Sequence, residues 1–199
     1  MEERQLGVWL RRLRVTATVV FIAALCGAVA VLVIAFIPGS PVVVELNTTR
    51  LSGLDGIQGV VRDVIADPAG RIPFRVVHPS LGQRLLYLAT TLPGVLLIAE
   101  IARRMSALLR SAEVTDPFTT HTVRELTFLA KLTAFGGFGV SVLSNAATSI
   151  LGSTILASGK PIGPYESPLV WLAVGLVFAG FAQLLSRGVA MRADLDTVI

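Results

Sequence analysis

Four long apolar runs, nearly free of charged residues, constrain this chain more than any other feature of its sequence. Three of them contain no Asp, Glu, Lys or Arg, and these are Val15–Ile37 with 23 residues, Leu132–Gly159 with 28 and Ser167–Ser186 with 20. A helix needs about 20 apolar residues to cross the hydrocarbon core of a bilayer, which is roughly 30 Å thick. A fourth, shorter run, Leu85–Glu100, contains the pair Pro93-Gly94. The sequence therefore predicts four membrane-spanning helices.

The composition excludes most other classes of protein. Only 15% of the 199 residues are charged, whereas soluble domains carry about 25%, and the mean hydropathy is +0.74. A single cysteine cannot form an internal disulfide. The predicted fold class is an all-α integral membrane protein, a four-helix transmembrane bundle with a small α/β extracytoplasmic cap. The predicted spans, within one membrane domain 1–199, cover about 15–37, 85–104, 128–157 and 168–187.

The distribution of positive charge predicts the direction of threading. Four spans place both termini on one side of the membrane, and that side receives eleven of the Lys and Arg residues against six on the other. Positive residues accumulate on the cytoplasmic side. We therefore expect a multi-pass protein of the inner or plasma membrane with cytoplasmic N- and C-termini. The arginines are spread over several short segments, so direct binding of nucleic acid is not expected even though the pI is near 10.

Residues 38–84 form the predicted extracytoplasmic loop. Val42–Leu46 has the composition of a short strand, and Ile72, Phe74 and Val76 alternate with polar residues or proline in a second one. Between them, apolar residues of 57–65 recur with helical spacing. This strand–helix–strand order predicts the α/β cap.

Residues 102–126 form the predicted cytoplasmic loop, and residues 188–199 form a cytoplasmic tail. The second helix is expected to continue as an amphipathic stub and to end before Asp116-Pro117, because proline disfavours helical geometry in the residue before it. Thr119 is a good N-cap for the next helix, and Thr122-x-x-Glu125 is a competing capping box. Phe118 is expected to pack back into the bundle. This segment is interpreted either as a capped re-entry turn or as a docking site for a partner.

Two of these cytoplasmic segments resemble the DUF2975 family of bacterial membrane proteins. The segments are Asp116, Pro117, Phe118 and Thr119, followed by an arginine-bearing helix, and the pair Arg187 and Gly188, followed by an acidic-apolar tail. The four-span layout with a large first outer loop agrees. This chain has Thr120 and Thr122 where the family often has proline and asparagine. The resemblance implies no activity, but members are often encoded beside small helix-turn-helix regulators, so it implies a cytoplasmic regulator as partner.

Polar residues within the spans are the other functional candidates. Glu100 and Lys131 lie near the cytoplasmic ends of adjacent helices, where they are expected to form an ion pair, and Gln183 is expected at similar depth. Asn145 shares one face of the third span with Ser141 and Thr148, which suits packing between helices. The alternative interpretation of Glu100 and Lys131 is a gated polar site open to the cytoplasm.

No catalytic constellation or metal-ligand motif is recognisable in the sequence. The two histidines, His78 and His121, fall on opposite sides of the predicted membrane and therefore cannot share a metal ion within one protomer. We therefore expect a protein that is not an enzyme and has no cofactor. The predicted role is regulatory, accessory or sensory, in which the outer cap is coupled to a cytoplasmic partner. The alternative is a small transporter or channel subunit that acts as a homo-oligomer.

Overall fold

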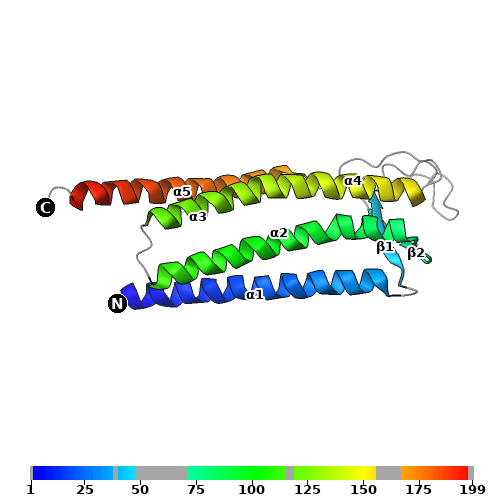
Figure 1. Ribbon diagram of the computed structural model, residues 1–199, viewed down its shortest axis with the longest axis horizontal. Coiled ribbons are helices and arrows are strands. Elements are labelled where there is room, and N and C mark those ends of the chain that lie inside the picture. The colour runs from blue at the N-terminus through cyan, green and yellow to red at the C-terminus, as the bar shows by residue number, and fades with distance from the viewer. Residues whose placement is uncertain (1, 38–39, 48–70, 115–118, 156–166, 197–199) are drawn as a thin grey trace, which may run out of the picture. The chain divides into compact units, whose positions relative to one another are not determined.

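The computed structural model describes residues 2–37, 40–47, 71–114, 119–155 and 167–196 (Figure 1). The elements are α1 (Glu2–Phe36), β1 (Val42–Asn47), β2 (Arg71–Val76), α2 (Leu81–Val114), α3 (Thr120–Lys131), η3 (Leu132–Gly136), α4 (Gly137–Ile155) and α5 (Leu169–Asp196). Four helical stretches are long and apolar enough to cross a membrane: Val8–Phe36, Leu81–Glu113, Thr120–Thr154 and Leu169–Met191. The predicted helical architecture with four candidate spans is confirmed.

The chain divides into two compact units. Unit 1 comprises Met1–Ala30, Leu92–Val142 and Glu166–Ile199, and unit 2 comprises Val31–Thr91 and Leu143–Tyr165. The helices α1, α2 and α4 each contribute residues to both units.

The core of unit 1 lies where α3 and η3 pack against α5. Leu126, Leu129 and Ala182 are buried together, and Ile101, Leu108, Phe178 and Leu185 cover them. Glycines permit this close approach, since a Cβ on Gly175 would lie 3.0 Å from the carbonyl oxygen of Ala130 and a Cβ on Gly137 would overlap the side chain of Trp171. Small residues at a helix interface let backbones approach closely inside a membrane.

One turn of π-helix, η3, interrupts the third span between α3 and α4. Such a turn holds one residue more than a regular α-helical turn, so it changes which side chains face a neighbour. Thr133 within it is 1% exposed, and Gly136 at its end lies against Leu97 of α2. The apolar run predicted a span over about 128–157, and nothing in the sequence indicated this irregular turn.

Large apolar side chains remain exposed along the spans. On α1, Val19, Ile22 and Val29 are each more than half exposed, and on α5 Leu176 is 72% exposed. Apolar surface of this extent is unfavourable in water, whereas lipid chains are as apolar as leucine. These faces fit contact with the acyl chains of a bilayer.

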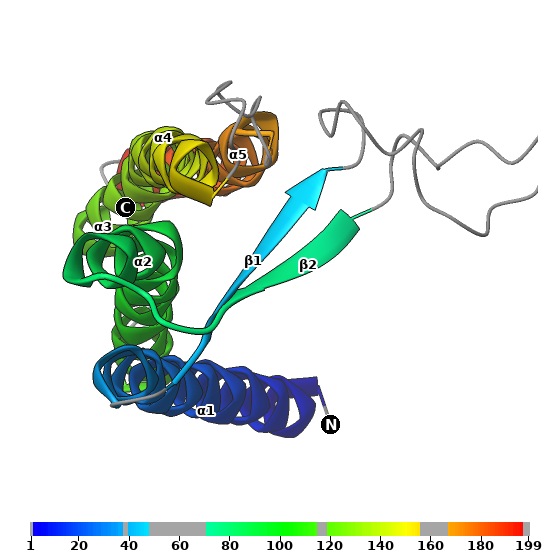
Figure 2. The same ribbon diagram turned by 90° about the vertical axis from the view of Figure 1, so that its right-hand side faces the viewer.

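In unit 2, β1 and β2 form an antiparallel pair whose register runs from Val42 opposite Val76 to Asn47 opposite Arg71. Figure 2 shows the two strands side by side. Both strands predicted from the sequence are confirmed. The predicted helix over 57–65, which would complete the cap, lies outside the described residues.

Two polar arrangements fix the helix ends of unit 2. Ser80 and Gln83 cap α2 reciprocally, because each backbone N–H donates to the other's side chain, at 3.0 and 3.3 Å. Arg84 Nη1 donates to the carbonyl oxygens of Ala35 and Ile37 at the end of α1, at 2.5 and 3.1 Å. These carbonyls have no partner within their own helix, so Arg84 joins the start of α2 to the end of α1.

Pro93 lies inside α2. A proline within a helix deprives the carbonyl four residues earlier of its donor, and inside a membrane neighbouring hydroxyls can satisfy the freed backbone groups. Close to this point, Ser144 Oγ of α4 donates to the carbonyl oxygen of Thr90 at 3.0 Å. The helix α2 continues through the proline, and this hydrogen bond joins it to α4 one residue away from the freed carbonyl.

Candidate functional site

The candidate site lies at the arginine-rich end of unit 1, where α2 ends and α3 begins. The start of α1 and the end of α5 lie at the same end of this unit (Figure 1). The part of the predicted cytoplasmic loop that the structure describes, residues 102–114 and 119–126, is almost entirely helical. We refer to these residues as the platform.

Contacts with α1 hold the α2 part of the platform in place. Arg14 Nη1 lies 2.5 Å from Glu113 Oε2, and one turn away the hydroxyls of Thr18 and Ser106 are 2.9 Å apart. Because these contacts join α1 to the last turns of α2, the helix persists well beyond its apolar part, as the sequence predicted.

The α3 part of the platform begins at a defined N-cap. Thr119 has extended backbone angles, φ −113° and ψ 151°, and its hydroxyl accepts the backbone N–H of Thr122 at 3.2 Å. The predicted N-cap is confirmed, and the competing box at Thr122 is not used, because Thr122 is buried and its hydroxyl meets that of Thr119 at 2.9 Å. The motif residues Asp116, Pro117 and Phe118 lie outside the described residues.

A network of ion pairs surrounds Glu100. Its Oε2 lies 2.8 Å from Arg103 Nε, and its Oε1 lies 2.6 Å from Arg104 Nε. Arg104 also extends toward α3, where its Nη1 is 3.7 Å from Glu125 Oε2 and its guanidinium lies 4.2 Å from the ring centroid of Phe128. Arg104 therefore connects the two helices.

The expected ion pair between Glu100 and Lys131 is wrong. Glu100 pairs with residues three and four positions ahead on its own helix, and this spacing brings the side chains together without any movement between helices. Lys131 is exposed and makes no ion pair with a carboxylate of the described residues. The pattern of one glutamate followed at i+3 and i+4 by arginines was visible in the sequence and would have identified the true partners.

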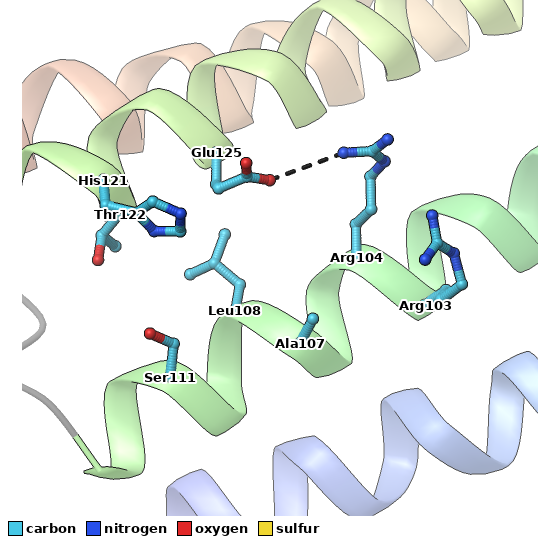
Figure 3. Close-up of a pocket in the computed structure, with 8 residues that line it drawn as sticks. All are labelled: Arg103, Arg104, Ala107, Leu108, Ser111, His121, Thr122 and Glu125. Atoms are coloured by element: carbon cyan, nitrogen blue, oxygen red, sulfur yellow. Dashed lines mark ion pairs between the residues drawn. The ribbon is translucent and has the colours of Figure 1, made fainter.

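Between α2 and α3 lies a cleft with two adjoining parts, which charged and apolar side chains line together. The inner part is a cavity of about 170 Å³ lined by Arg103, Arg104, Ala107, Leu108, Ser111, His121, Thr122 and Glu125. In Figure 3 the Arg104 and Glu125 side chains extend toward each other from the two helices. The outer part is an open hollow of about 670 Å³ lined by Arg104, His121, Arg124, Glu125, Thr127, Phe128 and Lys131. Three residues, Arg104, His121 and Glu125, line both parts. We refer to the whole as the α2–α3 cleft.

The other candidates lie apart from this cleft. Gln183 is exposed on α5 and lines a separate hollow with Thr127. Arg187 is exposed and Gly188 is half-buried, both near the end of α5, and Asn145 is half-buried on α4 in unit 2. Of the predicted intramembrane residues, only Glu100 and Lys131 therefore belong to the region of the cleft.

Two hydroxyls lie buried on the third span. Thr133 Oγ1 and Ser141 Oγ are enclosed and have no hydrogen-bond partner among the described residues. Ser141 lies on the face that the sequence predicted to be polar, whereas Thr133 was not singled out.

Within the residues that the structure describes, no group of three or more His, Cys, Asp or Glu side chains is placed to hold a metal ion. No protein-family model, no curated protein and no solved structure matches this chain. The resemblance to the DUF2975 family therefore stays a prediction.

Proposed function

We propose that this chain is a non-enzymatic regulatory or accessory protein of the inner or plasma membrane, which couples its extracytoplasmic segment to a cytoplasmic partner. The observation that carries the proposal is the platform. It is a capped helical hairpin that continues two spans beyond their apolar parts and is joined to α1 by Arg14–Glu113 and Thr18–Ser106. The positive-inside rule assigns this arginine-rich end to the cytoplasm.

The connectivity of the chain supports coupling. The strand β1 follows α1, and α2 follows β2, so the helices that flank the strand pair in sequence are the same two that carry the platform contacts. A change in register between α1 and α2 alters those contacts directly. Shifts of one helix along another are a common way in which a signal crosses a protein.

The state of the acidic side chains supports a non-catalytic role. Glu100 is held by two arginines, and Glu125 lies beside Arg104. Carboxylates engaged in this way stabilise helix geometry and are poorly suited to accept a proton from a substrate.

The alternative, a small oligomeric transporter or channel subunit, finds support in the enclosed hydroxyls of Thr133 and Ser141, because polar groups inside spans often line a path for a solute. The pairing of Glu100 with its own helix argues against that residue as a transport site. Solute flux in proteoliposomes that falls in the Ser141→Ala variant would favour the alternative.

The proposed function is tested by site-specific photo-crosslinking in native membranes. A photoreactive side chain is placed at Thr120, which is exposed on the platform, and in the matched control at Leu176, which is exposed on α5. We expect one discrete protein adduct at position 120 that is absent at position 176. The resemblance leads us to expect a helix-turn-helix regulator in that adduct. Identical adducts at both positions, or lipid adducts alone, would contradict the proposal.

A further inference from the structure

The α2–α3 cleft carries more positive charge than its carboxylates balance. Arg103 and Arg104 are engaged by Glu100, and Glu125 lies beside Arg104. Arg124 and Lys131 also line the outer hollow, are exposed, and make no ion pair with any carboxylate of the described residues. Two cationic side chains are therefore left without a counter-charge in one hollow.

The helical spacing of α3 explains why these two side chains share a face. Positions 121, 124, 128 and 131 recur at intervals of three and four residues, which places them in one stripe along a helix. The opposite stripe, which contains Leu126 and Leu129, is buried against Ala182 of α5. Packing against α5 thus fixes α3 in the orientation that directs Arg124 and Lys131 into the hollow.

Apolar and polar groups meet in this hollow. Phe128 lies between Arg124 and Lys131 on the stripe and is 43% exposed. The inner cavity adds the hydroxyl group of Ser111 and the imidazole of His121. Its volume of about 170 Å³ exceeds the roughly 15 Å³ that one water molecule needs, so it accommodates a small oxyanion.

We propose that the α2–α3 cleft binds a phosphate group, and that the headgroup of an anionic phospholipid supplies it. Arg124 and Lys131 provide the uncompensated charge, the Ser111 hydroxyl of the inner cavity donates to a phosphate oxygen, and Phe128 contacts the apolar part of the lipid. Basic pockets between spans on the cytoplasmic side are suited to such headgroups. This inference goes beyond the proposed function, because it requires no protein partner.

The test uses the full chain purified in detergent micelles. Native mass spectrometry counts bound lipid while phosphatidylglycerol is titrated, zwitterionic phosphatidylcholine serves as the parallel probe, and inorganic phosphate is added in a third arm. We expect one phosphatidylglycerol molecule to bind in preference to phosphatidylcholine and to raise the midpoint of thermal unfolding. If inorganic phosphate alone raises the midpoint equally and displaces the lipid, the cleft binds phosphate and the source is the free ion.

Paired variants make the test specific for the cleft. The double variant Arg124→Gln/Lys131→Gln is expected to weaken phosphatidylglycerol binding about 25-fold, because each cationic side chain near an anionic lipid surface contributes roughly fivefold. The matched control, Arg110→Gln/Arg187→Gln, removes two exposed arginines of unit 1 that line neither part of the cleft and is expected to bind as the unchanged chain does. Unchanged binding in the first variant, or equal losses in both, would overturn the proposal.

Discussion

Arg14 of α1 and Glu113 of α2 form an ion pair across 99 residues of sequence, with 2.5 Å between Arg14 Nη1 and Glu113 Oε2. The side chains are 34% and 19% exposed, and Glu113 Oε1 is buried without a hydrogen-bond partner among the described residues. The burial of this pair is therefore intermediate between that of a surface ion pair and that of a buried one. It fixes the last turn of α2, on which the platform depends.

A double-mutant cycle over Arg14→Gln and Glu113→Gln is expected to give a coupling energy of about 1 kcal/mol, because exposed pairs contribute about 0.2–1 kcal/mol and loss of one partner from a buried pair costs about 3–5 kcal/mol. The free energy of unfolding in detergent micelles is the measurement. Arg11→Gln, an exposed arginine of the same helix, is the control and is expected to have no effect. Additive single effects would show that the two side chains do not interact.

Two glycines at the interface of α5 with the third span are expected not to tolerate alanine. A Cβ at Gly137 would overlap Trp171, and a Cβ at Gly175 would lie 2.6 Å from that of Ala134. Overpacking of this kind costs about 1–3 kcal/mol, and thermal unfolding of Gly137→Ala and Gly175→Ala measures the loss.

Two further glycines provide the matched control. A Cβ at Gly139 on α4 or at Gly180 on α5 meets nothing within 4 Å. Alanine is favoured over glycine in a helix by about 1 kcal/mol, so Gly139→Ala and Gly180→Ala are expected to leave stability unchanged or to raise it. A loss of the same size in all four variants would refute the packing explanation.

Thr119→Ala is expected to destabilise the start of α3 by about 1 kcal/mol, because it removes the acceptor for the backbone N–H of Thr122. Hydrogen exchange at the first amides of α3 measures the effect, and faster exchange is expected there but not in α5. Thr119→Ser keeps the acceptor and is expected to exchange as the unchanged chain does. Thr120→Ala alters an exposed neighbour. If it speeds exchange as much as Thr119→Ala does, the cap is not responsible.

Glu100 is expected to be coupled to Arg104 and not to Lys131. The cycle of Glu100→Gln with Arg104→Gln should give about 0.5 kcal/mol or more, since side chains at i and i+4 interact on a helix surface. The cycle of Glu100→Gln with Lys131→Gln should be additive within error, because sites that share no contact behave independently. The free energy of unfolding is again the measurement. If Glu100 were coupled to Lys131 and not to Arg104, the ion pair expected from the sequence would be correct.

The predicted direction of threading is tested by cysteine labelling in intact cells. The single native cysteine is first removed as Cys26→Ala, and Arg62→Cys and Thr120→Cys are then made separately. A membrane-impermeant maleimide is expected to label position 62 and not position 120, because the positive-inside rule predicts that the platform faces the cytoplasm. Labelling of position 120 but not of position 62 would show that the chain is threaded in the opposite direction.

Local features of the chain were readable from its sequence. The uncharged runs predicted the candidate spans, alternation at Ile72, Phe74 and Val76 predicted the second strand, and Thr119 was identified as the cap of α3. Each of these depends on residues within one or two turns, where hydropathy and hydrogen-bonding capacity act through the local backbone alone. The helix predicted over 57–65 and the motif at 116–118 remain predictions, because they lie outside the described residues.

Only the tertiary structure decided which side chains meet across helices. Helical spacing already contained the pairing of Glu100 with Arg103 and Arg104. The contact of Arg104 with Glu125 and the ion pair of Arg14 with Glu113 depend on how separate helices approach. That approach is set by where small residues allow backbones to come close, as at Gly137 and Gly175. The sequence by itself determined that the chain forms four helical stretches long and apolar enough to cross a membrane, and that α3 begins after Thr119. The packing of α3 against α5 determined that Arg124 and Lys131 face one hollow.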